Sequence, residues 1–347
     1  MNVPPRNLSS KSQQDAPHSE VVLSCRVRMA RNIAGFPFVN RASAAQCQEL
    51  LGVARPVLLS SCIADEMIWV DLNQATLRDR RLLFERHLIS KHLAESDHRR
   101  AVAISGDESL SIMVNEEDHL RMQILAPGSQ LEQVFERLNA VDDAIENRLD
   151  YAFLPRWGYV TACPTNIGTG IRFSVMMHLP ALKMTNEIER VRRAAKDLHL
   201  AVRGYYGEGS ESAGDFYQIS NQVTLGRTEE EILESFQDVI LPSIIEYELQ
   251  ARKSLVERNA TVLDDRVHRA VGALRSSRLL GVEEAMKLLS RVRLGVHTGR
   301  ITGIKIEAVN ELFLQVQPTH LKVHAGTDLA PEELREARAN LVRKQLG

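Results

Sequence analysis

The sequence is poor in cysteine and in long apolar runs, and each shortage excludes a class of protein. The four cysteines among 347 residues form no Cys-x-x-Cys pair, so neither a zinc site nor a disulfide framework is predicted, and a reducing, cytoplasmic compartment is favoured. No apolar run approaches the ~20 residues of a membrane span. The formal net charge of −2 argues against a basic nucleic-acid-binding protein. We therefore expect neither nucleic acid nor a membrane as a partner.

Lysine is scarce beside arginine. Only 9 of the 43 basic residues are lysines, which leaves 34 arginines. A guanidinium offers a flat fork of donors that binds phosphate bidentately, whereas an ammonium is a point charge. Most arginines lie on solvated helix faces, so position decides whether any of them serves phosphate chemistry.

The usual phosphate-binding loops are also missing. The sequence contains no Gly-x-x-x-x-Gly-Lys-Ser/Thr, and the segment 168–173 departs from Gly-x-Gly-x-x-Gly at its last position. Neither His-Arg-Asp nor Asp-Phe-Gly occurs, which argues against a protein-kinase fold. A phosphate site in this chain would have to be assembled from separated segments.

Local signals predict an α+β fold. Capping boxes at Ser43, Ser129, Asn186 and Thr228 are expected to begin helices, and Pro242 is expected to kink one. The helices fall between groups of strands that short turns join as antiparallel hairpins. The strand-like runs are 67–72, 101–104, 110–114, 122–125, 158–162, 171–179 and 216–225.

Three parts of the chain differ in composition. Residues 1–19 are polar and contain prolines, which predicts a flexible arm. Residues 20–255 hold the strand groups and form the expected main domain. Residues 256–347 are predicted to form a mainly helical C-terminal domain, in which 301–313 fits either a helix or a strand.

Four features suggest chemistry, and each has a plainer explanation. Arg26 and Arg28 point the same way in an extended run and form either a phosphate clamp or a charged surface. The glycines of 163–170 let the backbone approach a ligand or simply form a turn. The glycine-rich segment 203–211 is either a surface loop or a lid that carries a carboxylate over substrate. His87 is by default a structural histidine.

Three consecutive acids, Glu116, Glu117 and Asp118, follow the apolar run 110–114 and precede Arg121. They form either a solvated turn or a set of carboxylates that receives a cation. Adjacent carboxylates are expected to raise one another's pKa, as a general base requires.

Together these segments resemble the phosphagen (guanidino) kinase family. SCRVRMARN at 24–32 is similar to the family's SSRVRLARN, NEEDHLR at 115–121 matches its motif, and CPTNIGTGIR at 163–172 is close to CPTNLGTGLR. The resemblance covers about residues 20–250 and implies a catalytic domain folded like glutamine synthetase, an antiparallel sheet flanked by helices. Cys25 replaces a serine of the family, and Phe173 replaces its usual alanine.

The resemblance implies transfer of the ATP γ-phosphoryl group to a guanidinium nitrogen, with Mg²⁺ held mainly by the nucleotide. It implies that Glu117 acts as base beside Glu116, that Glu208 is a second carboxylate, and that Cys163 is a substrate-side thiolate. Five arginines would clamp the phosphates, and His87 would contact the nucleotide. The implied nucleotide-binding positions are Ser24, Cys25, Arg26, Val27, Arg28, His87, Arg121, Arg172, Phe173, Ser174, Val175, Met176, Arg203, Gly204, Tyr205, Tyr206, Gly207 and Glu208.

The layout resembles the bacterial branch of the family that phosphorylates arginine residues in proteins. Only 23 residues precede Ser24, too few for the helical domain of the small-guanidine kinases, and about 90 follow the catalytic region. This branch implies protein substrates with exposed arginines, a homodimer, a zinc-containing activator, a Clp-type protease and a role in stress response and protein quality control. A small-guanidine kinase and an inactive binding protein remain alternatives.

The same branch carries an Arg-Asp-x-x-Arg-Ala motif that binds phosphoarginine allosterically. Here the aligned segment is 334–339, LREARA, which lacks the first arginine and the aspartate. We predict that this allosteric control is weak or absent.

Overall fold

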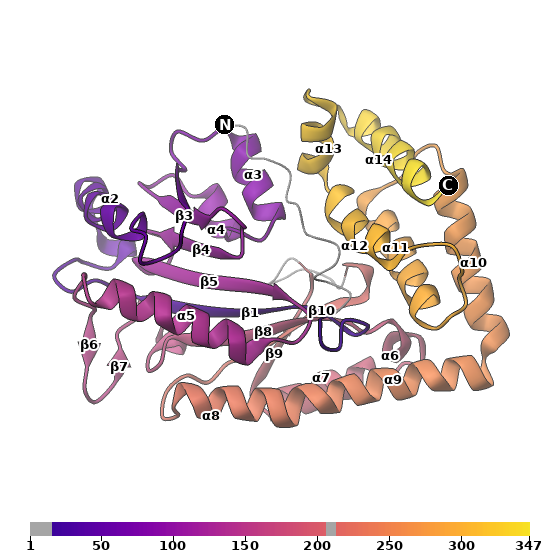
Figure 1. Cartoon of the computed structure of the whole chain (residues 1–347), viewed down its shortest axis with the longest axis horizontal. Coiled ribbons are helices and arrows are strands. Elements are labelled where there is room, and N and C mark those ends of the chain that lie inside the picture. The colour runs from indigo at the N-terminus through magenta and orange to yellow at the C-terminus, as the bar shows by residue number, and fades with distance from the viewer. Residues whose placement is uncertain (1–15, 206–212) are drawn as a thin grey trace. The chain divides into compact units, whose positions relative to one another are not determined.

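The apolar runs of the sequence form an eight-stranded sheet, which we describe from a computed structural model of residues 16–205 and 213–347 (Figure 1). The strand order is β2-β3-β4-β5-β1-β8-β10-β9, and the neighbouring strands from β2 to β1 pair antiparallel. The strands are β1 (Val22–Arg31), β2 (Met67–Asp71), β3 (Ala101–Ser105), β4 (Leu110–Val114), β5 (Leu120–Pro127), β8 (Ile171–His178), β9 (Leu200–Arg203) and β10 (Phe216–Asn221). The expected α+β class with an antiparallel sheet is confirmed.

A short second hairpin and a series of helices complete the fold. The hairpin consists of β6 (Phe153–Leu154) and β7 (Gly158–Tyr159). The helices before residue 240 are α2 (Ala44–Leu58), α3 (Leu77–Glu85), α4 (Lys91–Glu95), α5 (Leu131–Glu146), α6 (Pro180–Met184), α7 (Ile188–Asp197) and α8 (Glu229–Glu234). Those after it are α9 (Leu241–Arg258), α10 (Ala260–Ser276), α11 (Val282–His297), α12 (Ile306–Gln315), α13 (Pro318–Ala325) and α14 (Pro331–Leu346).

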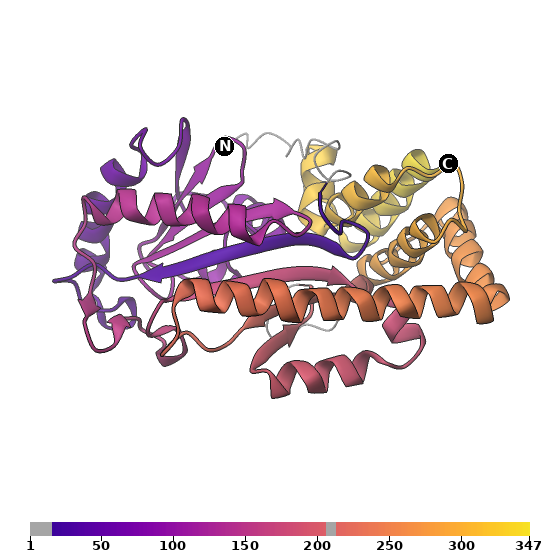
Figure 2. The ribbon, with the colours of Figure 1, turned by 60° about the horizontal axis from the view of Figure 1, so that its bottom comes forward.

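The described residues pack as two compact units. The first comprises 24–174 and 220–239, and the second comprises 16–23, 175–205, 213–219 and 240–347. In the first unit α5 lies along β1 and β5 (Figure 2), and its apolar side covers one face of these strands. In the second unit α10, α11, α12 and α14 contribute to an apolar core that includes Tyr205 and Phe216. The expected division of the chain at 255/256 stays a prediction.

Two of the four expected capping boxes form, at Ser43 and Thr228. The other two are wrong, although helices begin close by. α5 begins at Leu131 with Gln130 as its N-cap and no side-chain cap bond. Asn186 has a left-handed φ of 61° and its amide closes the turn after α6, so Glu187 and not Asn186 is the N-cap of α7.

Several expected boundaries also move. The run 158–162 is a strand only at Gly158–Tyr159, and 216–225 only at Phe216–Asn221. Within the ambiguous 301–313, the residues from Ile306 onward form helix α12. Pro242 lies in the first turn of α9, and the residues directly before this helix, Ser235–Ile240, are π-helical, so the regular α-helical pattern is interrupted next to the proline.

Candidate functional site

In the first unit the arginines of β1 and β5 share one face of the sheet. Arg28 pairs with Gln123 and Arg26 with Leu125, while Arg121 lies opposite Ala30. Directly opposed residues of an antiparallel pair have their side chains on the same face, and alternate residues of a strand share that face. Arg26, Arg28 and Arg121 therefore point to one side, which we call the arginine face.

The intervening residues point to the other side, where α5 covers the sheet. Cys25, Val27 and Phe173 are fully buried. The Cys25 thiol accepts a hydrogen bond from the Gln130 amide just before α5, and the Phe173 ring contacts Phe135 of α5 at 5.6 Å between centroids. Burial raises the pKa of Cys25 to about 11. The side chains of these three predicted nucleotide contacts thus lie away from the arginine face.

β8 continues the arginine face. The Gly170 carbonyl accepts a hydrogen bond from the Ala30 amide, and the Ser174 hydroxyl donates to the Arg26 carbonyl at 3.2 Å. Arg172, between them, is half-buried, and its Nη2 is 3.5 Å from Asn166 Oδ1. Ser24, at the other end of the β1–β5 ladder, is also half-buried.

His87 also lies beside this face. It follows α3 in a left-handed conformation with φ 59°, and its carbonyl accepts a hydrogen bond from Gln123 Nε2 at 2.7 Å. Gln123 is the register partner of Arg28. The structure therefore brings His87 next to Arg26 and Arg28. The sequence suggested this position for His87 only through the family resemblance.

Glu116 and Arg121 form a buried ion pair between the loop 115–119 and β5. Arg121 Nη1 lies 2.5 Å from Glu116 Oε2, the Ser90 hydroxyl donates to Glu116 Oε1 at 2.7 Å, and the Glu117 amide donates to Oε2. Burial opposes ionisation of Glu116, but the Arg121 charge and these hydrogen bonds outweigh it and lower its pKa. The upward shift expected from adjacent carboxylates is therefore wrong for Glu116.

Glu117 differs from its neighbour in exposure. Its side chain is 42 % exposed, against 3 % for Glu116. Its Oε2 accepts a hydrogen bond from Arg121 Nη2 at 2.9 Å. Arg121 is thus held by both glutamates, and its pKa is raised because their charges outweigh the effect of its burial. Of the two glutamates, Glu117 is the one that presents its carboxylate to solvent beside the arginine face.

Asp118 joins this loop to the segment before Cys163. Its Oδ1 accepts hydrogen bonds from the Ala162 amide and from Asn32 Nδ2, each at 2.7 Å. Asn32 also donates to the Val160 carbonyl and accepts from the His119 amide. Burial raises the pKa of Asp118 despite these bonds. The residues next to Glu117 and Cys163 are therefore directly hydrogen-bonded.

The segment 163–170 packs tightly against its neighbours. Cys163 Sγ is 3.0 Å from Thr165 Oγ1 and the thiol is half-buried. Gly168 has a left-handed φ of 109°, and a Cβ there would collide with the Thr224 carbonyl. The glycine thus permits a close approach of two backbone segments, and the position of the loop is fixed by its surroundings.

Sequence reasoning missed several residues that shape this site. Asn32 and Gln123 hold its parts together, as does Asp118, which was noted only as one of three acids, and all three lie inside or beside the motifs quoted above. Asn115 adopts a φ of 58° and donates from Nδ2 to the carbonyls of Cys47 and Arg99. For Asn115 and Asp118, the sequence signal that could have identified them is the run of polar residues directly after an apolar strand.

The remaining candidates belong to the second unit or lie outside the described residues. Val175 and Tyr205 are buried, Met176 and Tyr205 contribute to the apolar core of that unit, and Arg203 ends β9, directly before Gly204. Tyr206, Gly207 and Glu208 lie outside the described residues. The structure brings together the candidates of the first unit only.

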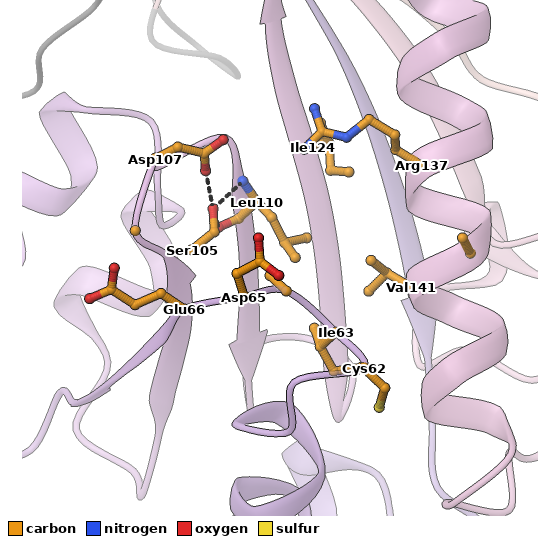
Figure 3. Close-up of a pocket in the computed structure, with 13 residues that line it drawn as sticks. Cys62, Ile63, Asp65, Glu66, Ser105, Asp107, Leu110, Ile124, Arg137 and Val141 are labelled. Atoms are coloured by element: carbon orange, nitrogen blue, oxygen red, sulfur yellow. Dashed lines mark hydrogen bonds between the residues drawn. The ribbon is translucent and has the colours of Figure 1, made fainter.

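A cavity of about 580 Å³ lies elsewhere in the first unit, and no candidate residue lines it (Figure 3). Leu110 and Ile124, on the strands, and Val141, on α5, line it, so it belongs to the face opposite the arginines. Asp107, which also lines the cavity, accepts a hydrogen bond from the Ser105 hydroxyl. Among the described residues, no group of three or more His, Cys, Asp or Glu is placed to hold a metal ion. No helix among them is long and apolar enough to cross a membrane.

The fold and this site define a phosphotransferase of the guanidino kinase type. Residues 59–251 match the family model described as ATP:guanido phosphotransferase, C-terminal catalytic domain, and residues 260–347 match that of the protein-arginine kinase McsB C-terminal domain. The chain belongs to the ATP:guanido phosphotransferase family.

Similar curated proteins include two protein-arginine kinases. The protein from Halalkalibacterium halodurans is 45 % identical over 342 residues, which cover 98 % of this chain and 95 % of the relative. The protein from Symbiobacterium thermophilum is 46 % identical over 333 residues, 95 % of this chain and 94 % of the relative.

Solved structures show the same fold. The duplicated taurocyamine kinase of Schistosoma mansoni, with bound transition state analog components, matches with a TM-score of 0.60 and 28 % identity over 66 % of this chain. The match spans about a third of that longer protein. Lombricine kinase matches with a TM-score of 0.58 and 27 % identity, covering 71 % of each chain.

Proposed function

We propose that this chain is a protein-arginine kinase, which transfers the γ-phosphoryl group of ATP to the guanidinium of arginine residues in proteins. One observation carries the proposal. The arginine face lies beside the loop of Glu117, which Asp118 bonds to the segment before Cys163, in a chain similar over nearly its whole length to protein-arginine kinases. In the first unit, the residues that we assign to phosphate binding thus lie beside those that we assign to guanidinium binding.

The arginines would bind and neutralise the phosphates. Phosphoryl transfer depends on positioning and on stabilising charge that develops on the phosphoryl oxygens. We assign Arg26, Arg28, Arg121, Arg172 and Arg203 to this task. The Glu116 pair holds the Arg121 guanidinium in place, so we assign Glu116 to positioning and not to proton transfer.

Glu117 would align the substrate and accept its proton. A guanidinium has a pKa above ~12 and is not nucleophilic while protonated, so a carboxylate must orient it and take the proton as the nitrogen attacks phosphorus. The exposed Glu117 is suited to this role. Glu208 would be the second carboxylate, and Cys163, as a thiolate, would lie against the guanidinium.

ATP would bind across the arginine face with His87 at its edge. We assign the predicted nucleotide-binding positions to this contact, through the backbone where the side chain is buried on the other face. Mg²⁺ prefers phosphate and water oxygens in octahedral geometry and would be held mainly by the nucleotide, where it neutralises phosphate charge.

The wider setting is part of the same proposal. We place the enzyme in the cytoplasm, as a homodimer formed through residues 256–347, with roles in stress response and protein quality control. Its substrates would be proteins with exposed arginines, and a zinc-containing activator and a Clp-type protease would be its partners. These assignments rest on the family resemblance.

Mass spectrometry for phosphoarginine tests the activity. The purified chain, ATP, Mg²⁺ and an arginine-rich protein are expected to yield acid-labile phosphoarginine on protein, and Glu117→Ala is expected to lose several orders of magnitude in rate. Label on free arginine alone would instead identify a small-guanidine kinase. Absence of any ATP turnover would identify an inactive binding protein.

A further inference from the structure

An exposed strip of apolar side chains borders the loop that carries Cys163. The β6–β7 hairpin extends away from the sheet (Figure 1) and exposes Phe153, Leu154 and Trp157. Val223 and Leu225, shortly after β10, are exposed as well. We call these five residues the apolar strip. Exposed apolar side chains that gather beside one loop indicate an interaction surface.

The strip and the Cys163 loop form one bonded structure. The Tyr159 amide donates to the Gly168 carbonyl at 2.8 Å, and a Cβ on Gly158 would collide with that carbonyl. On the other side of the loop, Thr224 Oγ1 donates to the carbonyls of Thr165 and Ile167 at 3.0 and 2.8 Å. The hairpin and the 223–225 segment therefore flank the loop.

The support under the hairpin is rigid. The Arg31 guanidinium lies 3.5 Å from the centroid of the Tyr159 ring and is itself held by buried Asp142 through Nε and Nη2. Phe153 packs edge-on against the same ring, 5.3 Å between centroids. The exposed side chains of the strip are thus presented from a fixed position, which lowers the entropic cost of binding.

We propose that the apolar strip binds the polypeptide around the target arginine and selects arginines flanked by apolar residues. The inference rests on the proposed function and names its substrate class. A substrate guanidinium that reaches Glu117 and Cys163 carries its neighbouring residues across the surface beside the 163–170 loop. The strip makes part of that surface apolar, with the Arg156 guanidinium 5.0 Å from the centroid of the Trp157 ring, so apolar flanks gain burial against the strip and polar flanks do not.

The kinetic test uses two peptides with equal length and charge and one arginine each, flanked by Val, Leu and Phe in one and by Ser and Asn in the other. Wild type is expected to prefer the apolar peptide. Leu154→Ser/Trp157→Ser is expected to lose about tenfold in kcat/KM for that peptide, and less than twofold for the polar one. This pair leaves the Phe153–Tyr159 contact in place.

A matched control replaces two apolar side chains of similar fractional exposure elsewhere in the same unit. Ile68 and Leu77 are 44 % and 51 % exposed, against 50 % and 45 % for Leu154 and Trp157. The Ile68→Ser/Leu77→Ser variant is expected to keep wild-type kcat/KM for both peptides. An equal loss in both double variants would mean a general effect of surface polarity and would overturn the proposal.

Tryptophan fluorescence tests contact without relying on turnover. The chain has two tryptophans, so Trp69→Phe leaves the exposed Trp157 as the reporter. The apolar peptide, added without ATP, is expected to shift its emission to the blue, because binding removes the indole from water, whereas the polar peptide leaves it unchanged. Equal spectra with both peptides would overturn the proposal.

Three further outcomes decide between this inference, the proposed function and self-association. If wild type phosphorylates both peptides equally, the strip has no role in selection, and the kinase activity stands. If it phosphorylates neither peptide nor any protein, the proposed function fails and this inference with it. If Leu154→Ser/Trp157→Ser changes only the sedimentation of the protein, the strip binds a second copy of the chain and the proposal is wrong.

Discussion

Asp118 accepts a hydrogen bond from the backbone amide of Ala162 at 2.7 Å, and this bond joins the two loops of the candidate site. Asp118 follows Glu117, and Ala162 precedes Cys163. The bond therefore fixes the separation of the proposed base and the proposed thiolate. Asp118 and Ala162 need not touch substrate for their bond to affect the rate. A displacement of a reacting group by about 1 Å can lower the rate as much as ~100-fold.

We expect Asp118→Ala to slow phosphoarginine formation by at least about tenfold, because the Cys163 segment loses its anchor. The free energy of unfolding is expected to fall by about 1–3 kcal/mol, since buried donors on Asn32 and Ala162 lose their acceptor. Asp118→Asn keeps one acceptor oxygen and should retain more activity. Initial rates and urea unfolding measure both quantities. Full activity in a destabilised Asp118→Ala would show that the bond is only structural.

Substitution by Gln should lower mainly the rate at Glu117 and mainly the stability at Glu116. Glu117→Gln is expected to lower kcat by about 10³-fold, with the unfolding free energy within about 0.5 kcal/mol of wild type. Glu116→Gln is expected to lower the unfolding free energy by about 3 kcal/mol, because it leaves Arg121 with one less buried partner. Initial rates and denaturant midpoints of the two variants measure these effects. A stable, inactive Glu116→Gln would reverse the two assignments.

The Glu116 pair also predicts an acid limb of stability. The pKa of Glu116 lies below its ordinary 4.5 in the folded chain, so its contribution is complete above pH 4.5 and is lost as pH falls through the folded-state pKa. The stability difference between wild type and Glu116→Gln should therefore shrink below pH 4.5. A difference that stays constant to pH 3 would contradict the pairing.

How much of this site could be predicted depends on the range of the contacts involved. Alternation along β1 sufficed to place Arg26 and Arg28 on one face, and the register with β5 agrees. The predicted direction of the Glu116 pKa shift is wrong because the sequence shows its acidic neighbours, but neither the 2.5 Å ion pair with Arg121 nor the hydrogen bond from Ser90. The Asp118–Ala162 bond spans 44 residues, a separation at which no periodicity or capping signal operates.

Local signals failed for a different reason where two elements meet. Asn186 has the sequence of an N-cap, yet it adopts a left-handed φ of 61° that ends the preceding turn. Asn186 closes the turn at the end of α6, so it does not serve as the N-cap of α7. At Thr228 no helix precedes closely, and the predicted capping box forms.

In the second unit, buried His178 predicts a second pH dependence. Arg293 Nη1 donates to His178 Nδ1 at 2.8 Å, so His178 Nε2 carries the proton and donates to Ser290 Oγ at 2.9 Å. Ser290 in turn donates to Asp215. Burial, with the charges of Arg293, Arg252 and His297, lowers the pKa of His178 well below its ordinary 6.5.

A histidine with a lowered folded-state pKa makes the protein less stable in acid. Below pH 6.5 the unfolded chain takes up a proton that folded His178 does not, and each further pH unit costs about 1.4 kcal/mol. Burial likewise lowers the pKa of His297 to about 3. Urea unfolding at pH 7.5, 6 and 5 should show this loss, and His178→Gln should have a shallower slope. Parallel slopes would contradict a neutral buried His178.

Arg338 lies in the segment aligned with the phosphoarginine-binding motif, and the structure gives it a structural role. Its side chain is almost fully buried, Nε donates to the Val316 carbonyl and Nη1 to the Leu280 carbonyl, each at 2.7 Å. These bonds tie α14 to the end of α12 and to the segment before α11. A guanidinium engaged in this way is not presented to a ligand.

We therefore expect added phosphoarginine to leave the rate of the wild-type enzyme unchanged over a concentration series. Arg338→Ala is expected to lower the unfolding free energy by about 2–4 kcal/mol, because two buried carbonyls lose charged donors. Arg335→Ala, in the same segment but exposed, serves as the matched control and should stay within about 0.5 kcal/mol of wild type. Cooperative stimulation of the wild type that disappears in a normally stable Arg338→Ala would show that the motif still binds phosphoarginine despite its two missing residues.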